Sequence, residues 1–182
     1  MFKNIIFKNI ILDNNNNNNN EYDNVRRSII DISSNKLLSI NFDEILNRHN
    51  IQIDLINMLY HNDESFIEKK IIINELKKKI NNYKIQDKKK NIHEIHNLIT
   101  LDSLIKKLYE SKLLCYYCKN NVFIFYKLVR DKQQWTLDRI NNLDEHTYDN
   151  TVICCYDCNI KRRRTNSKKF LFTKNLKITK EQ

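Results

Sequence analysis

The sequence predicts an α+β fold in which a helical N-terminal region precedes a small β-rich module. Apolar residues between positions 41 and 83 recur at the spacing of helices with one buried face. Residues 122–129 and 134–140 are instead dense in aromatic and β-branched side chains, a composition typical of strands. Two C-x-x-C pairs bracket this β-rich segment: Cys115 with Cys118, and Cys155 with Cys158.

Length and charge limit the organisation and the partners. The 182 residues fit one compact unit, and 41% hydrophobic residues are enough for a core. We divide the chain into an N-terminal segment at 1–40, a helical region at 41–112 and a cysteine-bearing module at 113–182. The net charge of +10 favours a polyanionic partner, because such an excess of charge repels itself. Nucleic acid is the first candidate.

The composition contains no Gly or Pro and is rich in Asn, Ile and Lys, as expected of an AT-rich genome. We expect its turns to use Asn or Asp, which tolerate left-handed backbone conformations. The asparagine tract at 14–20 has no apolar face and is predicted to be a disordered spacer. The apolar run at 1–12 is interrupted by two lysines and is too short to cross a membrane, so no membrane partner is expected.

The helical region is expected to contain three or more helices. Residues 41–60 predict the first and residues 64–83 the second, from their apolar periodicity. One or two further helices are expected over residues 92–114, with Asp102 as an N-terminal cap. We interpret the clustered lysines of this region as solvated helix faces, with phosphate contact as the alternative.

The cysteine pairs suit either disulfides in a secreted protein or metal ligands in an intracellular one. No signal peptide is recognised, so we expect a reducing, intracellular location, cytoplasmic or nuclear, and no secretion. Two C-x-x-C turns complete the tetrahedral four-thiolate site that structural Zn²⁺ prefers. The predicted zinc ligands are Cys115, Cys118, Cys155 and Cys158. The remaining cysteine, Cys154, is expected to pack as a small apolar side chain.

The segment between the cysteine pairs predicts strands, a loop and a helix in a fixed order. The expected elements are strands at 122–129 and 134–140, a loop at 141–150, a strand at 151–155 and a helix from Tyr156. Trp135 is expected to anchor a small core beside the zinc, in preference to stacking on a base.

Residues 135–162 read W-T-L-D-R-I-N-N-x-x-x-H-T-x-D-N-x-V-x-C-C-x-x-C-N-x-x-R. This pattern resembles the zinc-bearing branch of the HNH endonucleases, the ββα-metal or His-Me finger superfamily, over residues 115–170. The resemblance implies a ββα finger in which Asp138 and Asn159 hold one divalent metal against the scissile phosphate. A carboxylate and an amide oxygen are hard ligands, which suit Mg²⁺ or Mn²⁺.

The sequence departs from the family at the usual catalytic histidine. Arg139 follows Asp138 where the family has His, and a guanidinium cannot act as a base at neutral pH. We therefore assign the base or proton carrier to His146, with Tyr148 as a weaker substitute, and expect Arg139 to clamp a phosphate. Asn150 is expected to pin the loop through side-chain hydrogen bonds to the backbone, with a plain turn residue as the alternative.

A basic run follows Asn159 and is predicted to neutralise phosphates without reading sequence. Its expected nucleic-acid contacts are Lys161, Arg162, Arg163, Arg164, Lys168 and Lys169. A nuclear-localisation signal has the same appearance. Phe170 and Leu171 are expected to pack the C-terminal tail against the finger.

The function predicted from these observations is an HNH-type, metal-dependent endonuclease that nicks DNA or cleaves both strands, leaving a 5′-phosphate if the family pattern holds. One alternative is a catalytically inactive zinc module that binds nucleic acid, and another is a zinc-stapled protein-interaction domain. RNA remains open as the substrate in place of DNA. A dimer also remains open, since no feature fixes the oligomeric state.

Overall fold

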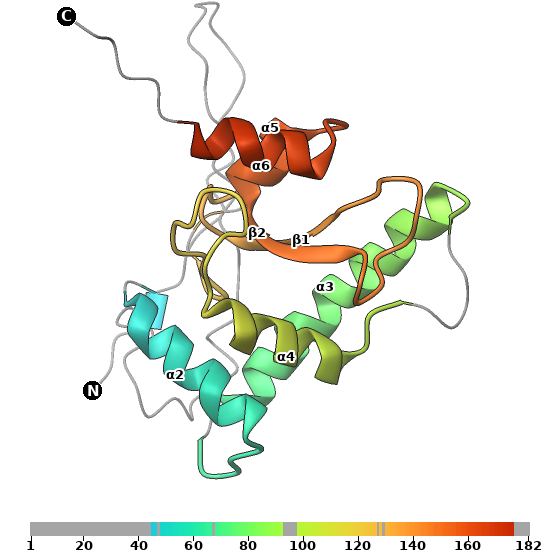
Figure 1. The fold of residues 1–182 in the computed structure, drawn as a ribbon. Helices are drawn as coiled ribbons and strands as arrows, with labels where there is room; N and C mark the ends of the chain where they lie inside the picture. The colour runs from blue at the N-terminus through green and yellow to red at the C-terminus, as the bar shows by residue number, and fades with distance from the viewer. Residues whose placement is uncertain are drawn as a thin grey trace, which may run out of the picture.

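The computed structural model describes residues 45–46, 48–66, 68–92, 98–126, 128 and 130–176 (Figure 1). The N-terminal segment at 1–40, with its asparagine tract, lies outside the described residues. The described part is a mixed α+β arrangement, which confirms the predicted class. None of its helices combines the length and the apolar character that a bilayer crossing requires.

Three helices are described within residues 48–112. They are α2 at His49–Tyr60, α3 at Lys69–Lys89 and α4 at Leu101–Ser111. The predicted helices overlap with them, but α3 begins and ends about one and a half turns later than its apolar pattern indicated. The cap of α4 also differs from the prediction: Thr100 Oγ1 accepts a hydrogen bond from Ser103 N at 3.2 Å, and Asp102 lies in the first turn.

The C-terminal part is a two-stranded ribbon followed by two helices. Strand β1 at Trp135–Arg139 pairs antiparallel with β2 at Thr151–Cys155. Helix α5, Tyr156–Arg162, starts directly after β2, and α6, Ser167–Asn175, follows a short turn. The ribbon lies between the α5/α6 pair on one side and helices α2–α4 on the other (Figure 1). The predicted order of strand, loop, strand and helix is present from β1 onward.

The strand predicted at 122–129 is not formed in the described residues of that segment, which contribute only isolated bridges such as Phe123 with Gln134. The side chain of Gln52 takes the place of a partner strand. Its Oε1 accepts from Ile124 N at 2.7 Å and from Phe125 N at 3.1 Å, while its Nε2 donates to Phe125 O at 3.2 Å. Because one buried glutamine satisfies this backbone, the apolar side chains enter the core without a sheet.

The helical part and the β-ribbon share one hydrophobic core. Buried residues from both parts belong to a single cluster that includes Leu55, Leu76, Leu108, Phe125, Trp135, Ile153 and Phe170. Polar contacts also cross between the parts, since His49 Nε2 lies 3.0 Å from Leu113 O. Trp135 is 1% exposed, so it packs in the core as predicted. The ring of Phe170 lies 4.9 Å from the ring of Tyr117, and Leu171 is partly buried, which confirms the expected packing of α6.

Left-handed backbone in this glycine-free chain is carried mostly by residues other than Asn and Asp. The described residues with positive φ are Asn62, Asn91, Lys112, Leu113, Lys119, Arg130 and Arg163. The expectation that Asn or Asp would fill these turns is therefore wrong for most of them. Each such residue costs free energy that the surrounding contacts must offset.

Candidate functional site

Four cysteine sulfurs converge at the junction of β2 and α5. Their Sγ atoms all lie within 4.8 Å of one another, and Cys118 Sγ lies 3.9 Å from Cys155 Sγ. Thiolates placed about 2.3 Å from one ion at tetrahedral angles lie about 3.8 Å apart. The donor set and its dimensions therefore fit Zn²⁺. The cluster consists of the predicted residues Cys115, Cys118, Cys155 and Cys158.

Local hydrogen bonds preform the cluster. Tyr116 N donates to Ile153 O at 2.8 Å, which ties the first cysteine turn to β2. Cys155 caps α5, its Sγ accepting from Cys158 N at 3.4 Å. Hydrogen bonding from Cys155 lowers the pKa of Cys115, which favours the thiolate form that binds metal. Cys154 lies outside the cluster, fully buried, with its Sγ 3.2 Å from Thr136 Oγ1, as expected of a packing residue.

A pocket of about 1090 Å³ lies beside β1. Its walls are α3, the loop between β1 and β2, and the turn between α5 and α6. Asp138, His146 and Asn159 all line this pocket, so the three residues predicted to act together share one concave surface. Among the described residues of its lining, Asp138 is the one carboxylate, and the cations are Lys79, Lys90, Arg139, Arg162, Arg163 and Arg164. The pocket is therefore suited to an anion.

Asp138 is fully engaged by neighbouring donors. Its Oδ1 accepts from Arg162 Nη2 at 2.7 Å, and its Oδ2 accepts from Arg162 Nε and from the Tyr117 hydroxyl at 2.6 Å. The side chains of Asp138 and Arg162 are only 4% and 1% exposed. In this arrangement Asp138 and Asn159 do not form an open site for Mg²⁺ or Mn²⁺, because Arg162 binds both carboxylate oxygens of Asp138 and the Tyr117 hydroxyl also binds Oδ2.

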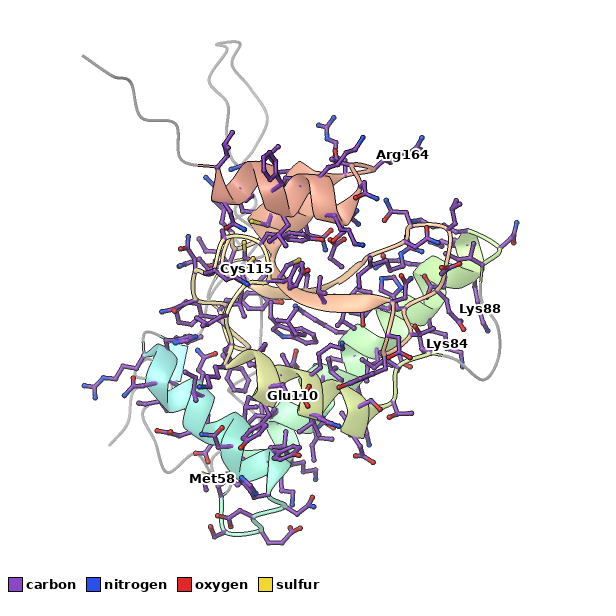
Figure 2. The ribbon with its side chains drawn as sticks, in the orientation of Figure 1. Met58, Lys84, Lys88, Glu110, Cys115 and Arg164 are labelled. Carbon is purple, nitrogen blue, oxygen red and sulfur yellow. The ribbon has the colours of Figure 1, made fainter. Side chains whose placement is uncertain are left out.

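Arg162 is not the exposed nucleic-acid contact that the basic run predicted. Its guanidinium is buried, and besides Asp138 it donates to Thr165 O, Arg139 O and Asn142 Oδ1, each within 2.8 Å. Arg162 is thus a structural link between β1, the loop and the start of α6. The other members of the run are exposed: Lys161, Arg163, Arg164, Lys168 and Lys169. Arg164 extends outward from the α5–α6 turn on the same side of the molecule as Lys88 of α3 (Figure 2).

His146 is buried and held by an acid from α3. Its Nδ1 lies 2.8 Å from each carboxylate oxygen of Asp87, and its backbone N–H donates to Asp87 Oδ2 at 2.8 Å. The ring packs on Tyr83 with centroids 4.6 Å apart. Nε2 makes no hydrogen bond to any residue that the structure describes. Burial lowers the pKa of His146 below its usual 6.5, although Asp87 acts in the opposite direction.

Arg139 shares the same acid. Its Nη1 lies 3.4 Å from Asp87 Oδ1 and donates to Asp144 O at 3.2 Å. The residue is 6% exposed. Burial lowers its pKa, and Asp87 opposes that effect. The guanidinium therefore packs under the β1–β2 loop, and its predicted phosphate contact stays a prediction.

The β1–β2 loop is stabilised by Asn150. Its Nδ2 donates to Asn141 O at 3.0 Å and to Glu145 O at 2.9 Å, and its Oδ1 accepts from Asn141 N at 2.8 Å. These are the side-chain to backbone bonds expected of Asn150. Asn159 has a different contact: its Nδ2 donates to Thr136 Oγ1 at 3.0 Å, across from α5 to β1.

Lys79 contacts Trp135, although the clustered lysines of α3 were expected to face solvent. Its Nζ bonds to Trp135 O and lies 4.3 Å from the centroid of the Trp135 ring. Burial lowers its pKa to about 7. Lys79 therefore contributes less positive charge to the pocket near neutral pH than the other cations do.

Sequence reasoning missed two residues of this site. Asp87 continues the buried stripe of α3 at helical spacing after Leu76 and Tyr83, so an acid in an otherwise apolar stripe was a usable signal. Tyr117, the donor to Asp138, lies between the first two cysteines, and nothing in the C-Y-Y-C sequence distinguishes it from its neighbour Tyr116.

Comparisons with family models, with curated proteins and with solved structures found no match. The residues and their geometry alone therefore carry the functional argument.

Proposed function

We propose that this protein is an HNH-type endonuclease that hydrolyses phosphodiester bonds of DNA in the basic pocket. The observation that carries the proposal is that Asp138, His146 and Asn159 all belong to the lining of one pocket whose other charged residues are cations. A chain of net charge +10 with such a pocket is suited to a phosphate backbone. The four-cysteine cluster, with Zn²⁺ bound, holds the ribbon and α5 that supply two of these residues.

In this proposal His146 is the general base. A buried imidazole with a lowered pKa is neutral near pH 7 and can accept a proton from the attacking water. The nitrogen that faces Asp87 is already engaged, so Nε2 takes the proton. The exposed guanidiniums of Arg163 and Arg164 and the Lys90 ammonium bind the phosphate and stabilise the charge that develops on it.

The family resemblance also implies a divalent metal ion, Mg²⁺ or Mn²⁺, at Asp138 and Asn159. Binding of Mg²⁺ or Mn²⁺ at Asp138 would have to displace Arg162, which holds both carboxylate oxygens. We assign no step to such an ion. Metal dependence is instead an outcome to be measured.

A second function is favoured by that same ion pair. A buried Asp138–Arg162 pair is a structural arrangement, and it supports a module that binds nucleic acid through the basic pocket without cleaving it. In this alternative the zinc cluster and the exposed cations have the same roles, while His146 only docks the loop. The two functions differ in one property, the turnover of phosphodiester bonds.

The test is nicking of supercoiled plasmid by the zinc-loaded full chain, in Mg²⁺, in Mn²⁺ and in a chelator of divalent cations weak enough to spare the zinc. We expect nicking by the wild type and a loss of about 10²–10⁴-fold in His146→Gln. The matched control is His61→Gln, because His61 is exposed at the end of α2. A single-stranded RNA substrate in parallel distinguishes DNA from RNA as the target.

Three results would overturn this account in part or whole. If the wild type binds DNA but does not nick it in any condition, the nuclease is rejected and only the non-catalytic binding module is supported. Equal activity in His146→Gln removes His146 as the base. Absence of salt-dependent binding to DNA and RNA removes both functions.

A further inference from the structure

We infer that Asp87 of α3 is a positioning residue for His146: it holds Nδ1 and the loop backbone so that Nε2 faces the pocket. The inference deepens the proposed function and rests on it for the catalytic consequence. It means that the helical part of the chain supplies a carboxylate to the site, which the cysteine-bearing module does not contain by itself. Nothing in the HNH-like segment supplies this acid, since Asp87 lies 59 residues before His146.

The geometry around His146 is fixed from three directions. The Asp87 carboxylate accepts from the His146 backbone N–H and contacts Nδ1, all at 2.8 Å. On the other side of the peptide, His146 O accepts from Ile99 N at 2.8 Å. The Tyr83 ring lies against the imidazole. Both backbone bonds and the ring contact come from the helical part, so the loop is docked on that part at His146.

The proton arrangement follows from the acceptor. A carboxylate only accepts hydrogen bonds, so Nδ1 of a neutral His146 must carry the proton and Nε2 must carry the lone pair. This is the tautomer that a base directed into the pocket requires. Without Asp87 the two tautomers would compete, and the ring would lose the bond that sets its orientation.

The burial of Asp87 supports a specific role. Its side chain is 0% exposed, and a buried carboxylate is costly unless it is paired. The charged and titratable groups that face the dyad are Arg139, at 3.4 Å from Asp87, with Lys90 and Tyr83 nearby. Asp87 faces the imidazole most closely, since both of its carboxylate oxygens lie 2.8 Å from Nδ1, whereas Arg139 Nη1 lies 3.4 Å away.

The first test reads the tautomer directly by nitrogen chemical shifts of the histidine rings in the zinc-loaded full chain at pH 7.5. The chain has five histidines, and the His146 signals are assigned from their loss in His146→Gln. We expect the wild type to show Nδ1 protonated and Nε2 unprotonated. A wild type with the opposite tautomer, or with both tautomers averaged, overturns the inference. This result does not depend on activity, so it is informative even if no nicking is found.

The second test uses Asp87→Asn, which keeps the shape and removes the charge. We expect at least about a tenfold lower nicking rate with unchanged DNA affinity, and a mixed His146 tautomer. The control is Asp144→Asn, an exposed acid of the same loop whose carboxylate bonds Asn141 Nδ2 and does not touch His146.

The outcomes of this second test are separable. An Asp87→Asn protein that folds, keeps the wild-type tautomer and nicks at the wild-type rate overturns the positioning role. If Asp87→Asn fails to fold, the tautomer of the wild type decides. Inactivity of the wild type with the expected tautomer rejects the nuclease and retains the positioning of the ring by Asp87.

Discussion

The cysteine cluster and the basic pocket lie on the same ribbon but are built in opposite ways. The cluster is local: two C-x-x-C turns, one after α4 and one at the start of α5, bring four sulfurs to within 4.8 Å of one another. The pocket depends on residues far apart in sequence, with His146 held by Asp87 and Asp138 held by Arg162 and Tyr117. One site can be found from spacing alone, whereas the other requires the tertiary structure.

The cysteine cluster contributes to the stability of the fold, whereas the basic pocket is the candidate site of the reaction. The sulfurs of the cluster face one another and include no cation among their number, so a metal ion completes them. In the pocket, Asp138 and Arg162 already satisfy each other, so a ligand at Asp138 must compete with existing bonds.

Loss of one zinc ligand is expected to have the largest effect. Cys118→Ser should lose one equivalent of bound zinc and the fold of the ribbon, because structural zinc contributes about 10–16 kcal/mol in small domains. Zinc content by elemental analysis and circular dichroism check this. The matched control is Cys154→Ala, which removes a buried thiol outside the cluster and should keep one zinc. Retention of a full equivalent by Cys118→Ser would contradict the four-thiolate assignment.

Breaking the buried ion pair of the pocket should be the next largest effect. Asp138→Ala leaves Arg162 charged and buried without its carboxylate, which costs about 3–5 kcal/mol in the free energy of unfolding. The double variant Asp138→Leu with Arg162→Met should recover only part of that loss, because it removes the unpaired charge but leaves Thr165 O, Arg139 O and Asn142 Oδ1 without their donor. Urea denaturation of the zinc-loaded proteins measures both. A loss below about 1 kcal/mol in Asp138→Ala would mean that the pair is not formed in solution.

A substitution at Gln52 tests whether its side chain replaces the hydrogen bonds of a partner strand for residues 124 and 125. Gln52→Ala removes the acceptor of the Ile124 backbone N–H, which lies 2.7 Å from Gln52 Oε1, at a cost of about 1–3 kcal/mol. The same urea denaturation checks the loss. The control is Gln86→Ala on the exposed surface of α3, which should change the free energy of unfolding by less than about 0.5 kcal/mol. Equal effects of the two variants would contradict the role of Gln52.

The exposed cations are expected to act on binding and not on stability. Arg163→Ala and Arg164→Ala should each reduce the salt dependence of DNA binding by about one unit of slope, because each removes about one phosphate contact. Fluorescence anisotropy across a salt series measures the slope. Lys84→Ala is the control, since Lys84 is exposed on α3 and does not line the pocket (Figure 2). A change in Lys84→Ala as large as in the arginine variants would place the binding surface elsewhere.

The features that the sequence could predict are those set by neighbouring residues. Strand β2 and the start of α5 follow from a β-branched run ended by a cysteine turn, and both lie where the pattern placed them. The strand at 122–129 could not be excluded, because its backbone is satisfied by Gln52 from α2. Apolar composition predicts burial there, but the hydrogen-bond partner is a matter of tertiary packing.

The same distinction applies to the candidate site. The pattern placed Asp138, His146 and Asn159 in one segment, and the structure places them on one pocket. It also assigned Arg162 to a solvent-facing basic run, because four consecutive basic residues are usually exposed. Arg162 turns inward instead, since the carboxylate of Asp138 on β1 lies within reach. Which of several adjacent cations is buried depends on the position of an acid far away in sequence.

The most direct test of the central claim is the pH dependence of single-turnover plasmid nicking by the wild type, between pH 5.5 and 8.5 with bound zinc monitored. A base acts when neutral, and burial places the pKa of His146 below 6.5. The nicking rate should therefore rise with pH through a limb below pH 6.5 and stay level above it. A limb centred above pH 8, or a rate that falls as the pH rises across this range, would contradict His146 as the base.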